Sequence, residues 1–150
     1  MLSAAVDTNV KISGMLSEHA SSASAELLDA LKHRKFELFE SQDSLAELRL
    51  VAHFIASRAP YSWTHDRIDK FCNVITDLGE IVEVKPIASA SIARDVTDTK
   101  FLNLALASNA DYLVTNDRRH LLRLKLIGHT MIVTPHKFIL ALRRDSGTLK

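Results

Sequence analysis

The sequence predicts an α/β sandwich in which helices cover a parallel β-sheet. Short apolar runs alternate along the chain with segments whose apolar residues recur at helical spacing. Strands that alternate with helices in this way are typical of parallel pairing, because each parallel connection needs a crossover. We find no internal repeat, low-complexity segment or linker. We therefore expect one domain over residues 1–144, followed by a short C-terminal tail at 145–150.

Five short segments have the composition of strands. Each is apolar or rich in β-branched and aromatic residues, and most lie close to turn-forming or helix-ending residues. They are residues 2–6, 36–39, 81–84, 112–114 and 130–133. We expect these five to form the sheet.

Helices are expected between the strands, where apolar residues follow the 3.6-residue period. They cover residues 24–34, 44–58, the segment between Thr64 and Gly79, and residues 98–108, 117–124 and 135–144. Pro60 ends the second of these helices and Asn109 is a plausible stop for the fourth. Residues 98–108 are apolar on most faces, so this helix should be deeply buried.

Composition excludes several classes of protein. The chain has 150 residues, 47% of them hydrophobic and 25% charged, which is ordinary for a soluble globular protein. No apolar run reaches the roughly 18–20 residues that span a bilayer, and no basic leader precedes the first apolar residues. The single cysteine, Cys72, excludes a disulfide framework and a cysteine-based zinc site. We expect a cytoplasmic protein without a membrane partner.

Neither of the common glycine-rich phosphate-binding patterns occurs, and this disfavours the usual nucleotide-cofactor enzymes. The seven histidines show neither the H-x-x-x-H nor the H-E-x-x-H pattern, so a histidine metal site is not indicated.

Charge is distributed unevenly although the net charge is only +1. Residues 118–150 carry eight Lys or Arg and one acid, a balance of +7, whereas the first 117 residues have a balance of −6. A basic flank beside an acidic body could hold a polyanion near a cation site. A solvated C-terminal helix would give the same pattern, and charge alone does not separate the two.

Four acids fall where a parallel sheet forms its sites, beyond the carboxyl ends of the strands. Asp7 directly follows the strand at 2–6, and Asp117 lies three residues beyond Val114. Glu47 is on the first turns of the helix that follows the strand at 36–39, and Asp98 opens the buried helix. We therefore expect all four to face one edge of the sheet.

Clustered carboxylates repel one another unless a cation neutralises them, and oxygen-only ligands favour Mg²⁺ or Mn²⁺ over zinc or copper. Such an ion can bind a phosphate oxygen, activate water and stabilise a leaving oxygen, as phosphodiester cleavage requires. Each acid also has a local alternative. Asp7 could form an Asx turn, Ser44 and Glu47 a capping box, Asp98 a helix-dipole contact and Asp117 an N-cap.

At this point the residues resemble a known family. Residues 6–10 (VDTNV) are similar to the opening signature of PIN domains, and Ser41 with Glu47 and Leu48 resembles the segment of their second acid. Residues 95–105 (DVTDTKFLNLA) and 110–117 (ADYLVTND) resemble their third and fourth segments. The resemblance spans nearly the whole chain and is nearest to the PIN branch of toxins from toxin–antitoxin pairs.

This resemblance implies a three-layer α/β/α sandwich and Mg²⁺- or Mn²⁺-dependent endonucleolytic cleavage, most often of RNA. Asp7, Glu47, Asp98 and Asp117 match the acidic quartet of the family. Thr115 matches a hydroxyl beside the last acid, and Asn9 matches the polar residue of the first signature. We place both beside the substrate.

The sequence departs from the family at two positions. Thr97 stands where many relatives have an extra acid, and Arg119 where many have Asp or Glu. The site is therefore expected to be less negative. Arg118 and Arg119 could contact a substrate phosphate, or they could form an exposed basic turn.

The sequence favours a metal-dependent endoribonuclease, with RNA as substrate and a cognate antitoxin protein as partner. A catalytically inactive PIN-like module that binds RNA or protein stays open, as does another Mg²⁺-dependent phosphoryl-transfer enzyme. A homodimer is also expected. Phe138, Ile139 and Leu142 of the last helix could form its interface, although the same residues could pack in the core.

Overall fold

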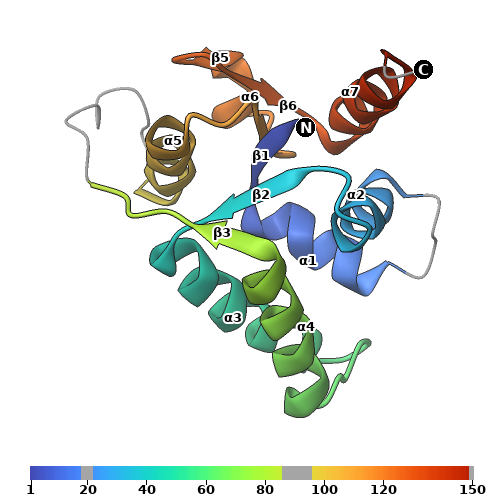
Figure 1. Ribbon diagram of the computed structural model, residues 1–150. Helices are drawn as coiled ribbons and strands as arrows, with labels where there is room; N and C mark the ends of the chain where they lie inside the picture. The colour runs from blue at the N-terminus through green and yellow to red at the C-terminus, as the bar shows by residue number, and fades with distance from the viewer. Residues whose placement is uncertain (18–21, 86–95, 149–150) are drawn as a thin grey trace.

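The computed structural model describes residues 1–17, 22–85 and 96–148, without the side chains of 96–98 and 147–148. A six-stranded sheet runs through the centre in the order β3-β2-β1-β4-β6-β5 (Figure 1). Its strands are β1 (Ser3–Val6), β2 (Glu37–Glu40), β3 (Gly79–Ile81), β4 (Tyr112–Val114), β5 (Leu126–Ile127) and β6 (Thr130–Val133). All neighbours pair in parallel except β5 and β6, which are antiparallel. The predicted α/β class with a mostly parallel sheet is confirmed.

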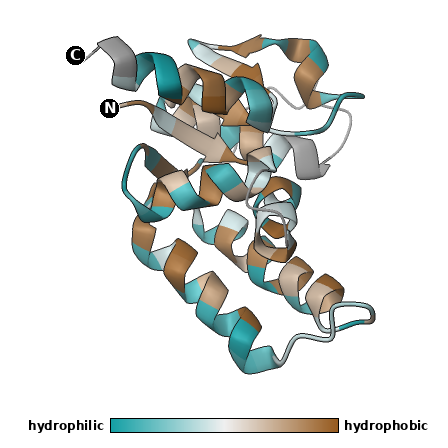
Figure 2. Ribbon diagram, turned by 90° about the vertical axis from the view of Figure 1, so that its right-hand side faces the viewer, coloured by the Kyte–Doolittle hydropathy of each residue, from teal (hydrophilic) through white to brown (hydrophobic). Residues whose placement is uncertain are grey.

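Helices cover both faces of the sheet and complete three layers. They are α1 (Thr8–Leu16), α2 (Ala23–Lys32), α3 (Gln42–Ala56), α4 (His65–Leu78), α5 (Val96–Ser108), α6 (Leu121–Leu124) and α7 (Pro135–Thr148). Ala4 and Val6 of β1 share one core with α1, α2, α3, α4 and α7, whereas Ala5 faces a second core with α5 and α6. The alternation of side chains along one strand thus assigns each helix layer its own core. Figure 2 shows hydrophobic and hydrophilic residues alternating along the helices, as expected for helices with one buried and one exposed face.

Local signals explain most element boundaries. The side chain of Ser22 caps α2 and that of Thr64 caps α4, each by accepting a backbone N–H from the first turn. Asn109 follows α5 with a φ of 56°, a left-handed conformation that asparagine tolerates better than most residues. The strands at 112–114 and 130–133 have the predicted bounds.

Several elements differ from the sequence predictions. Helix α1 was not predicted, because its apolar residues show little helical periodicity. Strand β3 begins at Gly79 rather than at 81, since Gly79 ends α4 and at once pairs with Leu38. The two-residue strand β5 was missed. Helix α7 continues to Thr148, so residues 145–148 are helical where a tail was expected. The boundary of the domain itself stays a prediction.

Gly14 allows α1 to approach α2 closely. A Cβ atom at this position would lie 2.6 Å from the Ser24 carbonyl oxygen and 2.7 Å from Leu28 Cδ1. Only a residue without a side chain fits there. The contact draws α1 against the rest of its layer and so fixes the helix that starts directly after Asp7.

The apolar face of α7 packs inside the molecule. Phe138 is fully buried and meets the rings of Phe36 and Tyr112 in edge-to-face contacts, with centroids 4.9 and 5.6 Å apart. Ile139 and Leu142 are also buried. These three residues therefore belong to the core and are not free to form the dimer interface considered above. Within the described ranges, no helix has the length and apolar character needed to cross a bilayer.

Candidate active site

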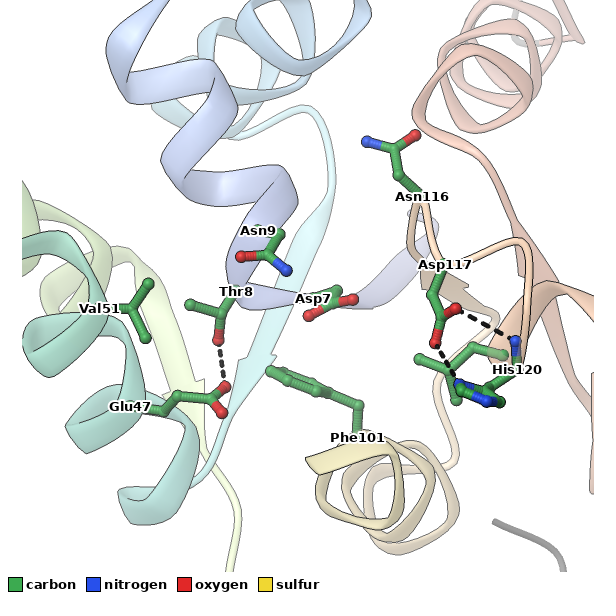
Figure 3. A pocket seen from close by; sticks show the side chains of 10 residues that line it. Asp7, Thr8, Asn9, Glu47, Val51, Phe101, Asn116, Asp117 and His120 are labelled. Carbon is green, nitrogen blue, oxygen red and sulfur yellow. Dashed lines mark hydrogen bonds and ion pairs between the residues drawn. The ribbon is translucent and has the colours of Figure 1, made fainter. Parts of the chain in front are cut away.

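Three of the four predicted acids line one cavity at the carboxyl edge of the sheet (Figure 3). Asp7 follows β1, Glu47 comes from α3 and Asp117 from the loop after β4. The cavity, which we call the acidic cavity, measures about 470 Å³. Its lining residues are Asp7, Thr8, Asn9, Glu47, Val51, Phe101, Asn116, Asp117, His120 and Leu121. The shared edge confirms that the sheet is wound as the sequence reasoning supposed.

Asp7 follows β1 and is held in place by hydrogen bonds to the end of the neighbouring strand β4 and to the residue after it. Its amide donates to the Val114 carbonyl at 2.9 Å, and its Oδ2 accepts the Thr115 hydroxyl at 2.8 Å. Burial raises the pKa of Asp7 above its usual value, and the negative charge of Glu47 raises it further. The Thr115 hydroxyl, the Asn9 amide and Lys11 lower that pKa, yet burial outweighs them. The ionised form of Asp7 is therefore costly while no cation is near.

Glu47 lines the acidic cavity and is not used as a helix cap. The capping box of α3 joins Ser41 and Ser44, whose side chains each accept a hydrogen bond from the backbone N–H of the other. The alternative capping box between Ser44 and Glu47 is therefore wrong. The Glu47 carboxylate instead accepts the hydroxyl of Thr8, and Lys100 Nζ lies 3.4 Å from its Oε1.

Asp117 serves its own loop and the acidic cavity together. Its Oδ1 accepts the amides of Arg119 at 3.2 Å and His120 at 3.1 Å, and its Oδ2 lies 3.7 Å from His120 Nδ1. Its own amide donates to Thr115 Oγ1 at 3.0 Å. The α-helix α6 begins only at Leu121, so the expected helix at 117–124 is shorter. The buried Thr115 hydroxyl thus joins Asp7 to the Asp117 loop.

Asp98 lies on the first turn of α5, but its side chain is outside the described residues. The same helix contributes the side chain of Phe101 to the lining of the acidic cavity (Figure 3). Among side chains that the structure describes, no three Asp, Glu, His or Cys residues are close enough to hold an ion together. Convergence of all four acids on a metal therefore stays a prediction.

The predicted substrate-binding residues separate into two places. Asn9 lines the acidic cavity and Thr115 lies just beneath it, hydrogen-bonded to Asp7. Arg118 and Arg119 are exposed and do not line this cavity. Arg118 instead lines a neighbouring hollow, which touches the acidic cavity at Asn116.

A buried ion pair that the sequence did not predict lies beside the site. Lys11 Nζ lies 2.6 Å from Glu40 Oε1, both side chains are only 1% exposed, and the Ser44 hydroxyl also donates to Glu40. The Lys11 ammonium is 5.7 Å from the centre of the Phe101 ring. Nothing local distinguishes Lys11 or Glu40, since the pair joins positions 29 residues apart. The roles of Thr8, Phe101 and Lys100 were missed for the same reason, whereas His120 lies only three residues from its partner Asp117.

Comparison with known proteins agrees with this geometry. A family profile described as PIN domain matches residues 3–119. No curated protein sequence matches the chain.

Solved structures with the same fold include VapBC2 from Rickettsia felis bound to a DNA fragment from its promoter. The identity is 16% and the TM-score 0.57, over 89% of this chain and 98% of that one. FitAB bound to the IR36 DNA fragment shares 19% identity at a TM-score of 0.58, over 88% and 94% of the two chains. PAE2754 from Pyrobaculum aerophilum shares 15% identity at a TM-score of 0.62, over 95% and 90%.

At these identities the structural likeness concerns the fold. The profile match covers most of the chain and includes the segments of Asp7, Glu47, Asp98 and Asp117. The chain therefore belongs to the PIN domain family, whose members are nucleases.

Proposed function

We propose that this PIN domain is a Mg²⁺- or Mn²⁺-dependent endoribonuclease that hydrolyses phosphodiester bonds of RNA. Asp7, Glu47, Asp98 and Asp117 would hold the ion. The observation that carries the proposal is the acidic cavity, which Asp7, Glu47 and Asp117 all line at one edge of the sheet. RNA is also the substrate that the motif resemblance implies.

The donor set fits a hard divalent cation. Its members are carboxylate oxygens, which such ions prefer. Burial and the charge of Glu47 both raise the pKa of Asp7, so a cation beside it would favour the ionised form. When bound, the ion would supply charge for a phosphate oxygen and lower the pKa of a water molecule.

The surrounding residues orient these acids. Thr115 donates to Asp7, and Thr8 donates to Glu47, so each carboxylate has one oxygen fixed by a hydroxyl. Lys100 balances the charge of Glu47 from α5. The Phe101 ring supplies an apolar part of the lining of the acidic cavity. Asn9 would hydrogen-bond the substrate at the mouth of the acidic cavity.

Substitution of two of the four acids, Asp7 and Asp98, tests this function. Asp7→Asn and Asp98→Asn should each lower Mg²⁺- or Mn²⁺-dependent cleavage of single-stranded RNA by at least a hundredfold, because each removes an ionised ligand. Asp43→Asn, on the exposed first turn of α3 and away from the acidic cavity, is the matched control and should cleave normally. Equal cleavage by the unmodified protein in excess EDTA would contradict metal dependence.

One observation favours a second candidate, a catalytically inactive module that binds RNA or protein. Both carboxylate oxygens of Asp117 already serve its own loop. Calorimetric titration with Mn²⁺ separates the candidates, since an inactive site should show no saturable binding. Testing small phosphate esters beside RNA would identify another phosphoryl-transfer enzyme.

We also propose that the protein is the toxin of a toxin–antitoxin pair and acts in the cytoplasm with an antitoxin protein as partner. The fold shared with VapBC2 and FitAB, both solved on DNA fragments, supports this role. Expression of the gene alone should arrest growth, and co-expression of the neighbouring open reading frame should relieve the arrest. The absence of growth arrest in both cases would contradict the toxin role. Size-exclusion chromatography with light scattering tests the predicted homodimer.

A further inference from the structure

A second hollow of about 780 Å³ lies beside the acidic cavity. Its charged lining is entirely basic and consists of Arg118, Lys125, His136 and Lys137, with no Asp or Glu among the lining residues. We call this hollow the basic groove. Three of its four basic residues lie beyond position 119, outside the segment that matches the family.

Asn116 connects the two hollows, because it lines both of them. In Figure 3 its side chain points away from the carboxylate of Asp117, its neighbour in the chain. A bound molecule that passes Asn116 could therefore occupy both hollows at once.

The cations of the basic groove are not used to stabilise the fold. No side-chain hydrogen bond or ion pair of Arg118, Lys125 or Lys137 occurs in the part of the chain that the structure describes. In contrast, Lys11 and Lys100 are paired with carboxylates. Unpaired positive charges that converge on a concave surface favour an anionic ligand.

Lys125 occupies a backbone conformation that costs free energy. Its φ of 62° and ψ of −34° fall in a region that L residues rarely adopt and that glycine adopts readily. Its carbonyl accepts the Ile132 amide at 2.9 Å, which anchors this turn to β6. Lys125 therefore holds a strained backbone position and also lines the basic groove.

Part of the lining of the basic groove is apolar. Met131, whose side chain is half exposed, and the partly buried Leu122 contribute apolar surface to it. A surface that combines apolar side chains with cations suits a nucleotide strand, whose bases and sugars contact the apolar side chains while its phosphates meet the cations.

We propose that the basic groove binds the single-stranded RNA that extends from the scissile phosphate in the acidic cavity. This inference rests on the proposed ribonuclease function. An acidic peptide from a protein partner would also meet the cations. RNA is favoured because the basic groove opens onto the acidic cavity at Asn116, and a bound strand must leave that cavity with a negative charge on every nucleotide.

The test measures binding of a fluorescein-labelled 12-nucleotide single-stranded RNA by anisotropy in EDTA, so that cleavage does not enter. Lys125→Ala/Lys137→Ala should weaken binding about tenfold and reduce the salt slope by about 1.4, at roughly 0.7 for each lost phosphate contact. Lys32→Ala/Lys70→Ala removes the same charge from exposed positions outside the basic groove and should bind like the unmodified protein. Equal affinity and slope in both double variants would overturn the proposal.

Lys125→Gly separates binding from folding. Glycine relieves the backbone strain, so the melting temperature should stay equal or rise while RNA binding still weakens severalfold. RNA binding that stays unchanged in Lys125→Gly would contradict the proposal.

A labelled acidic peptide of equal length is the final comparison. Loss of peptide binding with RNA binding intact in Lys125→Ala/Lys137→Ala would assign the basic groove to a protein partner and also overturn it. A protein that binds RNA through these lysines but cleaves none with Mg²⁺ or Mn²⁺ would refute the ribonuclease function alone.

Discussion

Two carboxylates at the ends of neighbouring strands have opposite surroundings. Glu40 ends β2 with Lys11 Nζ at 2.6 Å and the Ser44 hydroxyl beside it, and it is fully buried. Asp7 follows β1, faces the acidic cavity, and lacks such a direct cationic partner among the described residues. The first carboxylate is neutralised by the fold itself. The pKa of the second carboxylate, Asp7, is raised, and a cation bound beside it would lower that pKa.

This comparison separates a structural acid, Glu40, from Asp7, the acid at the same sheet edge that we propose to be functional. A buried charge that is fully paired contributes to a unique fold but offers nothing to a ligand. A partly desolvated carboxylate beside a second acid costs stability, and that cost is reversed by a cation. The distinction depends on partners, because both residues are acids at strand ends.

The largest expected effect on stability comes from breaking the ion pair between Lys11 and Glu40. Lys11→Met leaves the Glu40 carboxylate buried without its cation and should lower the free energy of unfolding by about 3–5 kcal/mol. Urea denaturation followed by circular dichroism measures this loss. The double variant Lys11→Met/Glu40→Gln should recover most of it, and a double variant as unstable as the single one would show that the ion pair is not the cause.

A smaller effect on stability is expected when the Thr115 hydroxyl, which donates a hydrogen bond to Asp7, is removed. Thr115→Val removes the donor to Asp7 and the acceptor of the Asp117 amide, and should cost about 1–3 kcal/mol. It should also raise the pKa of Asp7 further, because the Thr115 hydrogen bond lowers that pKa. Thr115→Ser keeps the hydroxyl and is the control. Thermal unfolding of both variants should rank serine above valine.

The smallest expected effect is a gain in stability, on replacement of Asp7 by asparagine. The folded pKa of Asp7 is above its ordinary value of 3.8, so Asp7 lowers stability as pH rises through the interval between these two values, and the loss persists above it. Asp7→Asn should therefore melt slightly higher than the unmodified protein at pH 7 in EDTA. The difference in melting temperature should shrink at pH 3.5, where Asp7 is mostly protonated and therefore neutral, like the asparagine that replaces it.

Addition of Mn²⁺ sharpens the same comparison. Metal binding should stabilise the unmodified protein at pH 7 and leave Asp7→Asn unchanged, which reverses the order of melting temperatures. An Asp7→Asn variant that melts lower than the unmodified protein in EDTA would contradict the account of Asp7 as an unpaired, desolvated acid.

The sequence by itself determined the alternation of strands and helices, the bounds of β4 and β6 and the capping of α4 by Thr64. It also placed Asp7, Glu47 and Asp117 at one edge of the sheet. These features follow from periodicity, caps and the rule that parallel strands present their carboxyl ends together. They depend on residues close in the chain or on the direction of the strands.

Only the tertiary structure decided which partners each acid has. The Lys11 to Glu40 pair, the Thr8 to Glu47 hydrogen bond and the Thr115 to Asp7 hydrogen bond join positions 29, 39 and 108 residues apart. Such contacts arise from how the layers pack, and side-chain charge depends on them because burial and distance set its free energy.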